Sequence, residues 1–165
     1  MSQVSSRGYS ALQIALHWAV AALVLFQIVF GESMEEFFDA LEEGEAISPQ
    51  DQFLGTAHYW TGLAILGLVA IRLMLRLSAG APGAAADTNW FTKVAGVMHW
   101  LFYALLVAVP LSGLLAFYHW ADLGDLHALA KPAFVVLVAL HAMAALYHST
   151  VLKDGTLRRM LVPAR

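Results

Sequence analysis

Histidine is the residue of this chain best suited to hold a metal or a cofactor. The 165 residues include seven histidines and no cysteine. Without cysteine there is no thiolate for an iron–sulfur cluster and no thioether link to a cofactor, so any bound group depends on His, Met, carboxylates or packing. Polar rings are unexpected in a chain that is 60% hydrophobic, because each ring buried in an apolar environment needs a partner. The elements that position the histidines decide which of them can act together.

Four long apolar runs predict transmembrane helices. Hydrophobic residues make up 60% of the chain and charged residues only 13%, which is far from the composition of soluble domains. A helix crosses the bilayer core with about 20 mainly apolar residues. The runs cover residues 10–30, 53–75, 94–118 and 127–152, each to within a few positions. We therefore expect an all-α fold, an integral membrane four-helix bundle that forms one domain over residues 1–165. The first run is too long for the apolar part of a signal peptide.

Charged residues predict the orientation of this bundle. Four spans place both termini on one side, and nearly all basic residues flank that side, which predicts that the termini are cytoplasmic. These residues are Arg7, Arg72, Arg76, Lys93, Lys153, Arg158, Arg159 and Arg165, whereas Lys131 alone falls on the opposite side. The segment 32–51, between the first two helices, holds eight of the twelve acidic residues and no Lys or Arg. We expect this segment to be an acidic loop on the outer side.

Four of the histidines fall at two depths in the bundle. His17 lies in the cytoplasmic half of the first helix, and His58 lies near the outer end of the second. On the fourth helix His127 is near the outer end and His141 follows 14 residues later, roughly 21 Å along a helix axis. Fourteen residues at about 100° each end about 40° short of four turns, so both rings can point into the bundle. His17 and His141 can share an inner level, and His58 and His127 an outer one.

Opposed imidazoles from two helices at one depth have the axial geometry of a six-coordinate b-type haem, and two levels predict two haems. Small residues are needed where a porphyrin approaches a backbone, and Gly62, Gly67 and Gly113 can provide that space. Arg72 and Arg76 are one turn apart at the cytoplasmic end of the second helix, where they can pair with the propionates of an inner haem.

Each of these features has an alternative without a cofactor. Membrane histidines also hydrogen-bond across helices or lie at the interface, and His119 and His148, near helix ends, fit that role. His99 is ambiguous, because it is buried at the start of the third helix. Glycines in membrane helices serve packing, and Arg72 and Arg76 can extend to the interface and enforce topology. A haem-free protein that moves divalent metal ions or protons remains an alternative.

Short motifs along nearly the whole chain resemble the bacterial cytochrome b561 family, which also includes cytochrome b subunits of some membrane-bound hydrogenases. The motifs are YSALQIALHW at residues 9–18, His58, the Arg72-x-x-x-Arg76 helix end, AVPLSG at 108–113, LHA at 140–142, Tyr147-His148 and LKDGTL at 152–157. Each motif alone is weak evidence for the family. Their order along the chain makes the resemblance specific.

The resemblance implies a function in membrane electron transfer. In the family, two b haems are held by four axial histidines, and the matching positions here are His17, His58, His127 and His141. Electrons pass between the quinone pool, such as ubiquinone, and a donor or acceptor on the periplasmic side of the bacterial inner (plasma) membrane. The resemblance also implies a quinone site near the cytoplasmic haem. His99 and His148 are candidates for proton handling there, because a histidine near its free-solution pKa exchanges protons readily.

The outer acidic segment bears on the redox partner. One activity in the family, oxidation of superoxide with transfer of the electron to quinone, is helped by a positively charged approach. The acidic segment 32–51 repels small anions and is better suited to a basic soluble electron carrier, unless it only keeps the loop soluble. A second alternative is a haem-bearing anchor subunit of a larger dehydrogenase or hydrogenase. Membrane lipid is an expected partner and nucleic acid is not.

Overall fold

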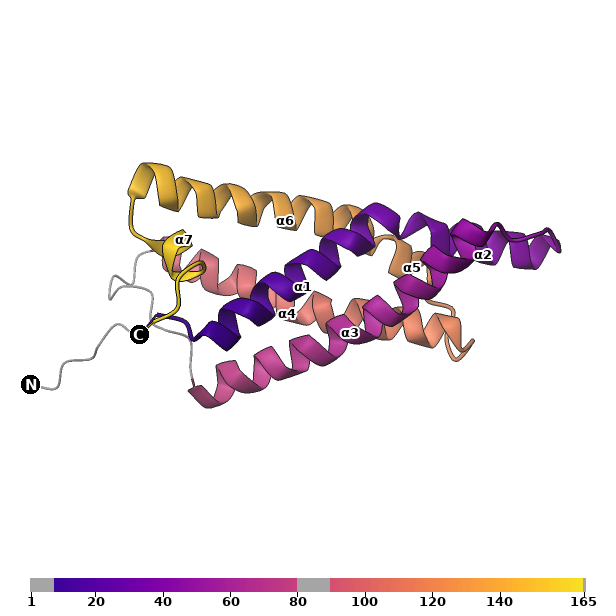
Figure 1. Ribbon diagram of the computed structural model, residues 1–165, viewed down its shortest axis with the longest axis horizontal. Helices are drawn as coiled ribbons and strands as arrows, with labels where there is room; N and C mark the ends of the chain where they lie inside the picture. The colour runs from indigo at the N-terminus through magenta and orange to yellow at the C-terminus, as the bar shows by residue number, and fades with distance from the viewer. Residues whose placement is uncertain (1–7, 80–89, 165) are drawn as a thin grey trace, which may run out of the picture.

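The structure, a computed structural model, describes residues 8–79 and 90–164, and within these ranges it contains helices and turns but no strand (Figure 1). Four helical spans are long and apolar enough to cross a membrane: Ala11–Phe30, Pro49–Ser78, Lys93–Phe117 and Gly124–Leu152. The prediction of an all-α fold with four membrane-spanning helices is confirmed. Arg7 and Arg165, two of the basic residues that predict the orientation, lie outside the described residues.

The first span is helix α1 (Ala11–Phe30), and local sequence fixes where it begins. Ser10 accepts a hydrogen bond from the Gln13 backbone N–H at 3.2 Å, and the Gln13 side chain accepts one from the Ser10 N–H at 2.9 Å. This reciprocal capping box satisfies backbone donors that a helix start leaves unpaired. The helix ends at Gly31, and a second helix follows directly.

Helix α2 (Glu32–Glu43) lies where the sequence predicted an acidic loop. Its apolar residues recur at the i, i+3, i+4 spacing of an amphipathic helix and pack on α3 and α4. A Cβ added at Gly55 of α3 would lie 3.5 Å from both Met34 and Phe37, and the Phe38 ring is 6.0 Å from that of Phe117. The run of acidic residues concealed this periodicity.

The two central spans are α3 (Pro49–Ala79) and α4 (Trp90–Phe117). Helix α3 extends four residues beyond the predicted run at each end. Ser48 accepts a hydrogen bond from the Asp51 N–H at 3.1 Å, and Pro49 occupies the first helical position, where a missing N–H costs nothing. Helix α4 contains Pro110, which membrane helices tolerate.

The fourth span consists of three helical segments rather than one. They are α5 (Gly124–Ala128), α6 (Ala130–Tyr147) and η1 (His148–Leu152), a π-helical turn. A short helix, α7 (Thr156–Arg159), then folds back against the start of α1. The Trp18 indole N–H donates to the Met160 carbonyl at 2.9 Å, and the Ala164 N–H donates to Tyr9 at 3.0 Å. The two ends of the described chain are thereby joined.

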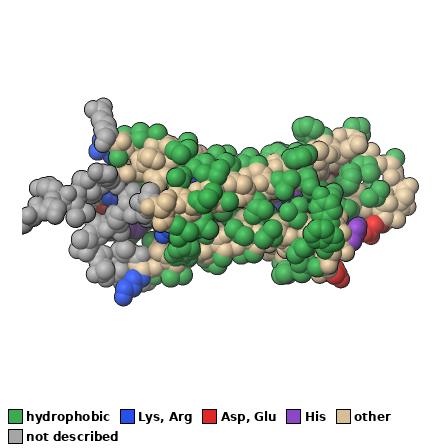
Figure 2. Space-filling model, turned by 90° about the horizontal axis from the view of Figure 1, so that it is seen from below, with side chains coloured by type: hydrophobic (Ala, Val, Ile, Leu, Met, Phe, Trp, Pro, Cys, Tyr) green, Lys and Arg blue, Asp and Glu red, His purple; other side chains and the backbone are tan. Residues whose placement is uncertain are grey.

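The two ends of the bundle differ in charge. The start of α1, the end of α3 and α7 lie at one end, and α2 and α5 lie at the other (Figure 1). Apolar side chains cover the middle of the face in Figure 2, with Lys and Arg at the first end and the clearest Asp and Glu at the second. Inside, Val20 of α1 packs against Ile65 and Val69 of α3. An apolar belt between charged ends is the surface that a lipid bilayer requires.

Candidate functional site

At the end of the bundle that carries α2, the rings of two histidines lie close together. The rings of His58 on α3 and His127 on α5 have centroids 5.9 Å apart and planes inclined at 74°. Both side chains are half-buried. Two imidazoles from different helices therefore meet at the level that the sequence predicted.

The His127 ring is fixed by its neighbours on α4. Its Nδ1 lies 2.9 Å from the Val109 carbonyl, which can only accept, so Nδ1 carries the proton and Nε2 keeps its lone pair. The ring lies almost on the backbone of Gly113. A Cβ at that position would be 2.8 Å from His127 Cε1 and 2.9 Å from Nδ1. Gly113, predicted to leave space for a cofactor, thus leaves space for the histidine itself.

His58 lies against the last turn of α1. Gln27 donates its Nε2–H to the His58 backbone carbonyl at 3.0 Å. A Cβ at Gly31 would lie 3.6 Å from His58 Nδ1. Among the described residues His58 Nδ1 is buried without a hydrogen-bond partner, unlike Nδ1 of His127.

At the other level three rings meet. The His17 ring on α1 is 6.3 Å from that of His141 on α6, with planes inclined at 55°. His99 of α4 also reaches His141, with centroids 5.5 Å apart and perpendicular planes. The Nδ1 of His99 is 2.6 Å from the Ala95 carbonyl one turn earlier. The sequence predicted the first pair, and the family resemblance placed His99 near the same level, but the contact of His99 with His141 was not predicted.

The spacing of the two pairs fits opposed ligation of one metal ion. An imidazole nitrogen lies about 2 Å from a bound metal and the ring centre about 1 Å further, so two opposed rings have centres about 6 Å apart. The observed separations are 5.9 and 6.3 Å. No three His, Cys, Asp or Glu side chains of the described ranges are grouped to hold a bare metal ion. Two opposed imidazoles suffice for iron whose other positions are filled by a porphyrin.

The two predicted propionate partners have different surroundings. Arg72 follows His58 by 14 residues, the same separation as between His127 and His141, so it lies near the depth of the inner pair. Its Nη1 is buried without a hydrogen-bond partner among the described residues. Arg76 instead lies over two aromatic rings, with Cζ 5.3 Å from the centroid of Trp100 and 5.7 Å from that of Tyr103. Arg72 therefore has a buried donor that an anionic group can satisfy.

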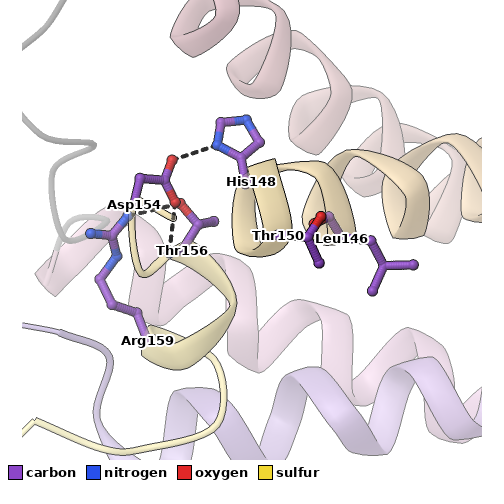
Figure 3. Close-up of polar contacts among 6 residues, drawn as sticks. All are labelled: Leu146, His148, Thr150, Asp154, Thr156 and Arg159. Atoms are coloured by element: carbon purple, nitrogen blue, oxygen red, sulfur yellow. Dashed lines mark hydrogen bonds and ion pairs between the residues drawn. The ribbon is translucent and has the colours of Figure 1, made fainter. Parts of the chain in front are cut away.

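His148, in the last helical turn of the fourth span, forms an ion-pair contact with a residue just beyond that span (Figure 3). Its Nδ1 is 2.5 Å from Oδ2 of Asp154. The Thr156 N–H donates to the other carboxylate oxygen at 2.9 Å. The chain reverses here through Lys153 and Gly155, which have left-handed φ values of 52° and 75°. This turn brings Asp154 under the ring of His148.

The hydrogen bonds to Asp154 favour its charged form. Burial alone would raise the pKa of Asp154, but the hydrogen bonds from His148 and Thr156 outweigh burial and lower the pKa to about 2. A carboxylate that accepts from Nδ1 holds the imidazole in one orientation and leaves Nε2 available for proton exchange. An Asp–His pair of this kind can hold a proton close to the membrane surface.

Sequence reasoning missed Gln27 and Asp154 as parts of the site. Gln27 is a polar residue between apolar neighbours in the first span, and this isolation is a signal that could have identified it. Asp154 belongs to the LKDGTL motif, but nothing in its spacing indicates the contact with His148. The other two glycines that were predicted to leave space for a porphyrin have different surroundings. A Cβ at Gly62 would lie 3.5 Å from Nε2 of Gln27, and a Cβ at Gly67 would have no neighbour within 4 Å.

Comparison with known proteins identifies relatives of this membrane bundle. The family model of prokaryotic cytochrome b561 matches residues 8–163. A cytochrome b562 of Cereibacter sphaeroides is 40% identical over 159 residues, covering 94% of this chain and 96% of the relative. A probable superoxide oxidase, CybB, of Yersinia pestis is 31% identical and covers 95% and 97%. Cytochrome b561 homolog 1 of Escherichia coli is 27% identical and covers 93% and 96%.

The protein is therefore a multi-pass membrane haem protein, with b-type haem as its cofactor. The chain belongs to the prokaryotic cytochrome b561 family. The family resemblance predicted from the motifs is confirmed.

Proposed function

We propose that this chain holds two b-type haems and transfers electrons between a membrane quinone, such as ubiquinone, and a donor or acceptor on the periplasmic side. His58 and His127 bind the outer haem, and His17 and His141 bind the inner one. The observation that supports this proposal is the pair of neighbouring imidazoles from different helices at each of two levels, with ring separations of 5.9 and 6.3 Å.

The charged ends support an orientation with both termini in the cytoplasm and the bundle in the bacterial inner membrane. The basic residues at the α7 end satisfy the positive-inside rule. Lys131, the one basic residue expected outside, forms an ion pair with Glu32 of α2. A fluorescent protein that folds only in the cytoplasm, fused after residue 165, should therefore fluoresce. A dark fusion with an active periplasmic reporter at the same position would contradict this orientation.

Three residues of the inner end, Arg72, His148 and Asp154, have distinct roles in this proposal. Haem, when bound, supplies a one-electron carrier whose potential depends on its ligands and surroundings. Arg72 pairs its unused donor with a propionate. His148 exchanges the proton that accompanies each electron at the quinone, and Asp154 holds its ring in place. His99 lies beside His141 and lines the same end of the bundle.

Purified protein tests the proposal directly. We expect a reduced b-type optical spectrum and two haems per chain. Substitution of His17 or His141 by Ala should remove one haem, and substitution of His58 or His127 should remove the other. A colourless preparation after expression with sufficient haem supply would contradict the proposal. One haem per chain that disappears only with the His17 and His141 substitutions would contradict the outer site alone.

The periplasmic partner is best described as cationic. The exposed residues of α2 include an acidic face, which comprises Glu35, Glu36, Asp39, Glu42 and Glu43. This face repels small anions and attracts basic proteins. One relative is a probable superoxide oxidase, which makes superoxide the second candidate. Oxidation of the reduced protein by a basic cytochrome should slow with added salt, whereas a fast reaction with superoxide at low salt would favour the second candidate.

A further inference from the structure

Two buried polar atoms at the outer level lack a hydrogen-bond partner in the described part of the chain, and they belong to neighbouring residues. They are Nδ1 of His58 and Oε1 of Gln27. The Gln27 amide is fixed beside His58, because its Nε2 donates to the His58 carbonyl at 3.0 Å. Both residues lie within membrane spans, where an unpaired donor or acceptor is costly. The two atoms can satisfy each other, directly or through a shared third group.

The chemistry of the two atoms is complementary. A histidine that binds a metal through Nε2 carries its proton on Nδ1 and requires an acceptor for it. The amide oxygen of glutamine is an acceptor only. His127 already has such an acceptor in the Val109 carbonyl, at 2.9 Å. Of the two outer rings, His58 is the one whose Nδ1 has no partner.

The position of the His58 ring supports the same pairing. A Cβ at Gly31 would lie 3.6 Å from His58 Nδ1. Gly31 follows Gln27 by one helical turn, and residues four apart are neighbours on a helix surface. The Nδ1 edge of the ring thus faces the turn of α1 that carries Gln27.

We propose that Gln27 accepts the hydrogen bond of the His58 Nδ1–H, directly or through one buried water, and is a positioning residue that sets the basicity of this ligand. The inference rests on the proposed role of His58 as a haem ligand. An acceptor at Nδ1 makes the imidazole more basic. A more basic ligand stabilises ferric over ferrous iron, so Gln27 lowers the midpoint potential of the outer haem. Gln27 acts through His58 and does not touch the haem.

Redox titration of purified variants, followed in the visible spectrum, tests this role. In Gln27→Leu the potential of the haem that disappears in His58→Ala should rise. At a fixed applied potential its ratio of reduced to oxidised form should increase about tenfold, which for one electron is 59 mV. The potential of the other haem should stay unchanged. Gln27→Met provides a second apolar variant with the same expected shift if Gln27→Leu does not fold.

Two further variants separate this role from packing. Gln27→Glu keeps an acceptor oxygen whether or not it is protonated, so the outer potential should not rise above that of the unsubstituted protein. Thr56→Val is the matched control at the same end of α3, because the Thr56 hydroxyl donates to its own helix, to the Gln52 carbonyl at 2.8 Å. Neither potential should change in this control.

Several results would overturn the inference. Unchanged potentials in the apolar variants, or equal shifts of both haems, would exclude a specific effect through His58. A rise in Gln27→Glu as large as in Gln27→Leu would assign the effect to the lost bond with the His58 carbonyl. Absence of haem from the unsubstituted protein would instead contradict the proposed function, so the two failures are distinguishable.

Discussion

Replacing Gly113 by alanine should selectively weaken the outer haem. The added Cβ would lie 2.8 Å from Cε1 of the His127 ring, whereas ordinary van der Waals contact begins at 3.4 Å. The ring or the helix must therefore move by about 0.6 Å. The hydrogen bond from His127 to the Val109 carbonyl, now 2.9 Å, opposes that movement. The strain falls directly on a proposed haem ligand.

The size of the effect follows from the cost of overpacking. Insertion of a methyl group into a tightly packed site costs about 1–3 kcal/mol. If this cost appears in haem binding, the affinity of the outer site falls by about 5- to 150-fold, because about 1.4 kcal/mol corresponds to a factor of ten. The inner haem, at the other end of the bundle, should keep its affinity and potential.

The assay is the loss of haem to an excess of a haem-free globin, followed in the visible spectrum. The matched control is Gly67→Ala, because a Cβ there would have no neighbour within 4 Å. Both substitutions raise helix propensity by up to about 1 kcal/mol, so a difference between them reports the contact with His127. If Gly113→Ala lost haem no faster than Gly67→Ala, the assignment of His127 to the outer haem by this geometry would be wrong.

Three other predictions concern both ends of the bundle. His99→Ala should retain both haems, whereas His17→Ala should lose one, as measured by the number of haems per chain. If His99→Ala lost the inner haem and His17→Ala kept it, His99 rather than His17 would be the ligand. The pKa of Asp154 lies below its usual 3.8, so its contacts are intact above about pH 4 and are lost as pH falls toward 2. Amide exchange at Thr156, corrected for its intrinsic pH dependence, should then accelerate in the unsubstituted protein but be fast at both pH values in Asp154→Ala, because alanine has no acceptor for the Thr156 N–H. Conversion of the acidic face of α2 to amides should reduce the rate with a basic cytochrome by about tenfold at low salt, and an unchanged rate would exclude this face as the docking site.

The helices of this protein could be predicted from sequence because span formation is a local property. About 20 apolar residues in a row suffice to define a membrane helix, and all four spans were found in this way. Helix α2 was missed, since charge rather than periodicity dominated the interpretation of residues 32–43. The depth of the histidines also followed from residue counts, because a helix rises by a constant amount per residue.

The sequence by itself determined the membrane fold, the charge of each end, the family and the depth of each histidine. Only the tertiary structure decided what each ring contacts: His99 beside His141, Asp154 beneath His148, and Gln27 next to His58. The physical reason is that these spans are apolar on nearly every side, because lipid as well as protein surrounds them. Such helices carry little periodic signal for the face that turns inward. Their rotation depends on contacts between helices, such as the approach of His127 to Gly113, that residue spacing within one helix does not encode.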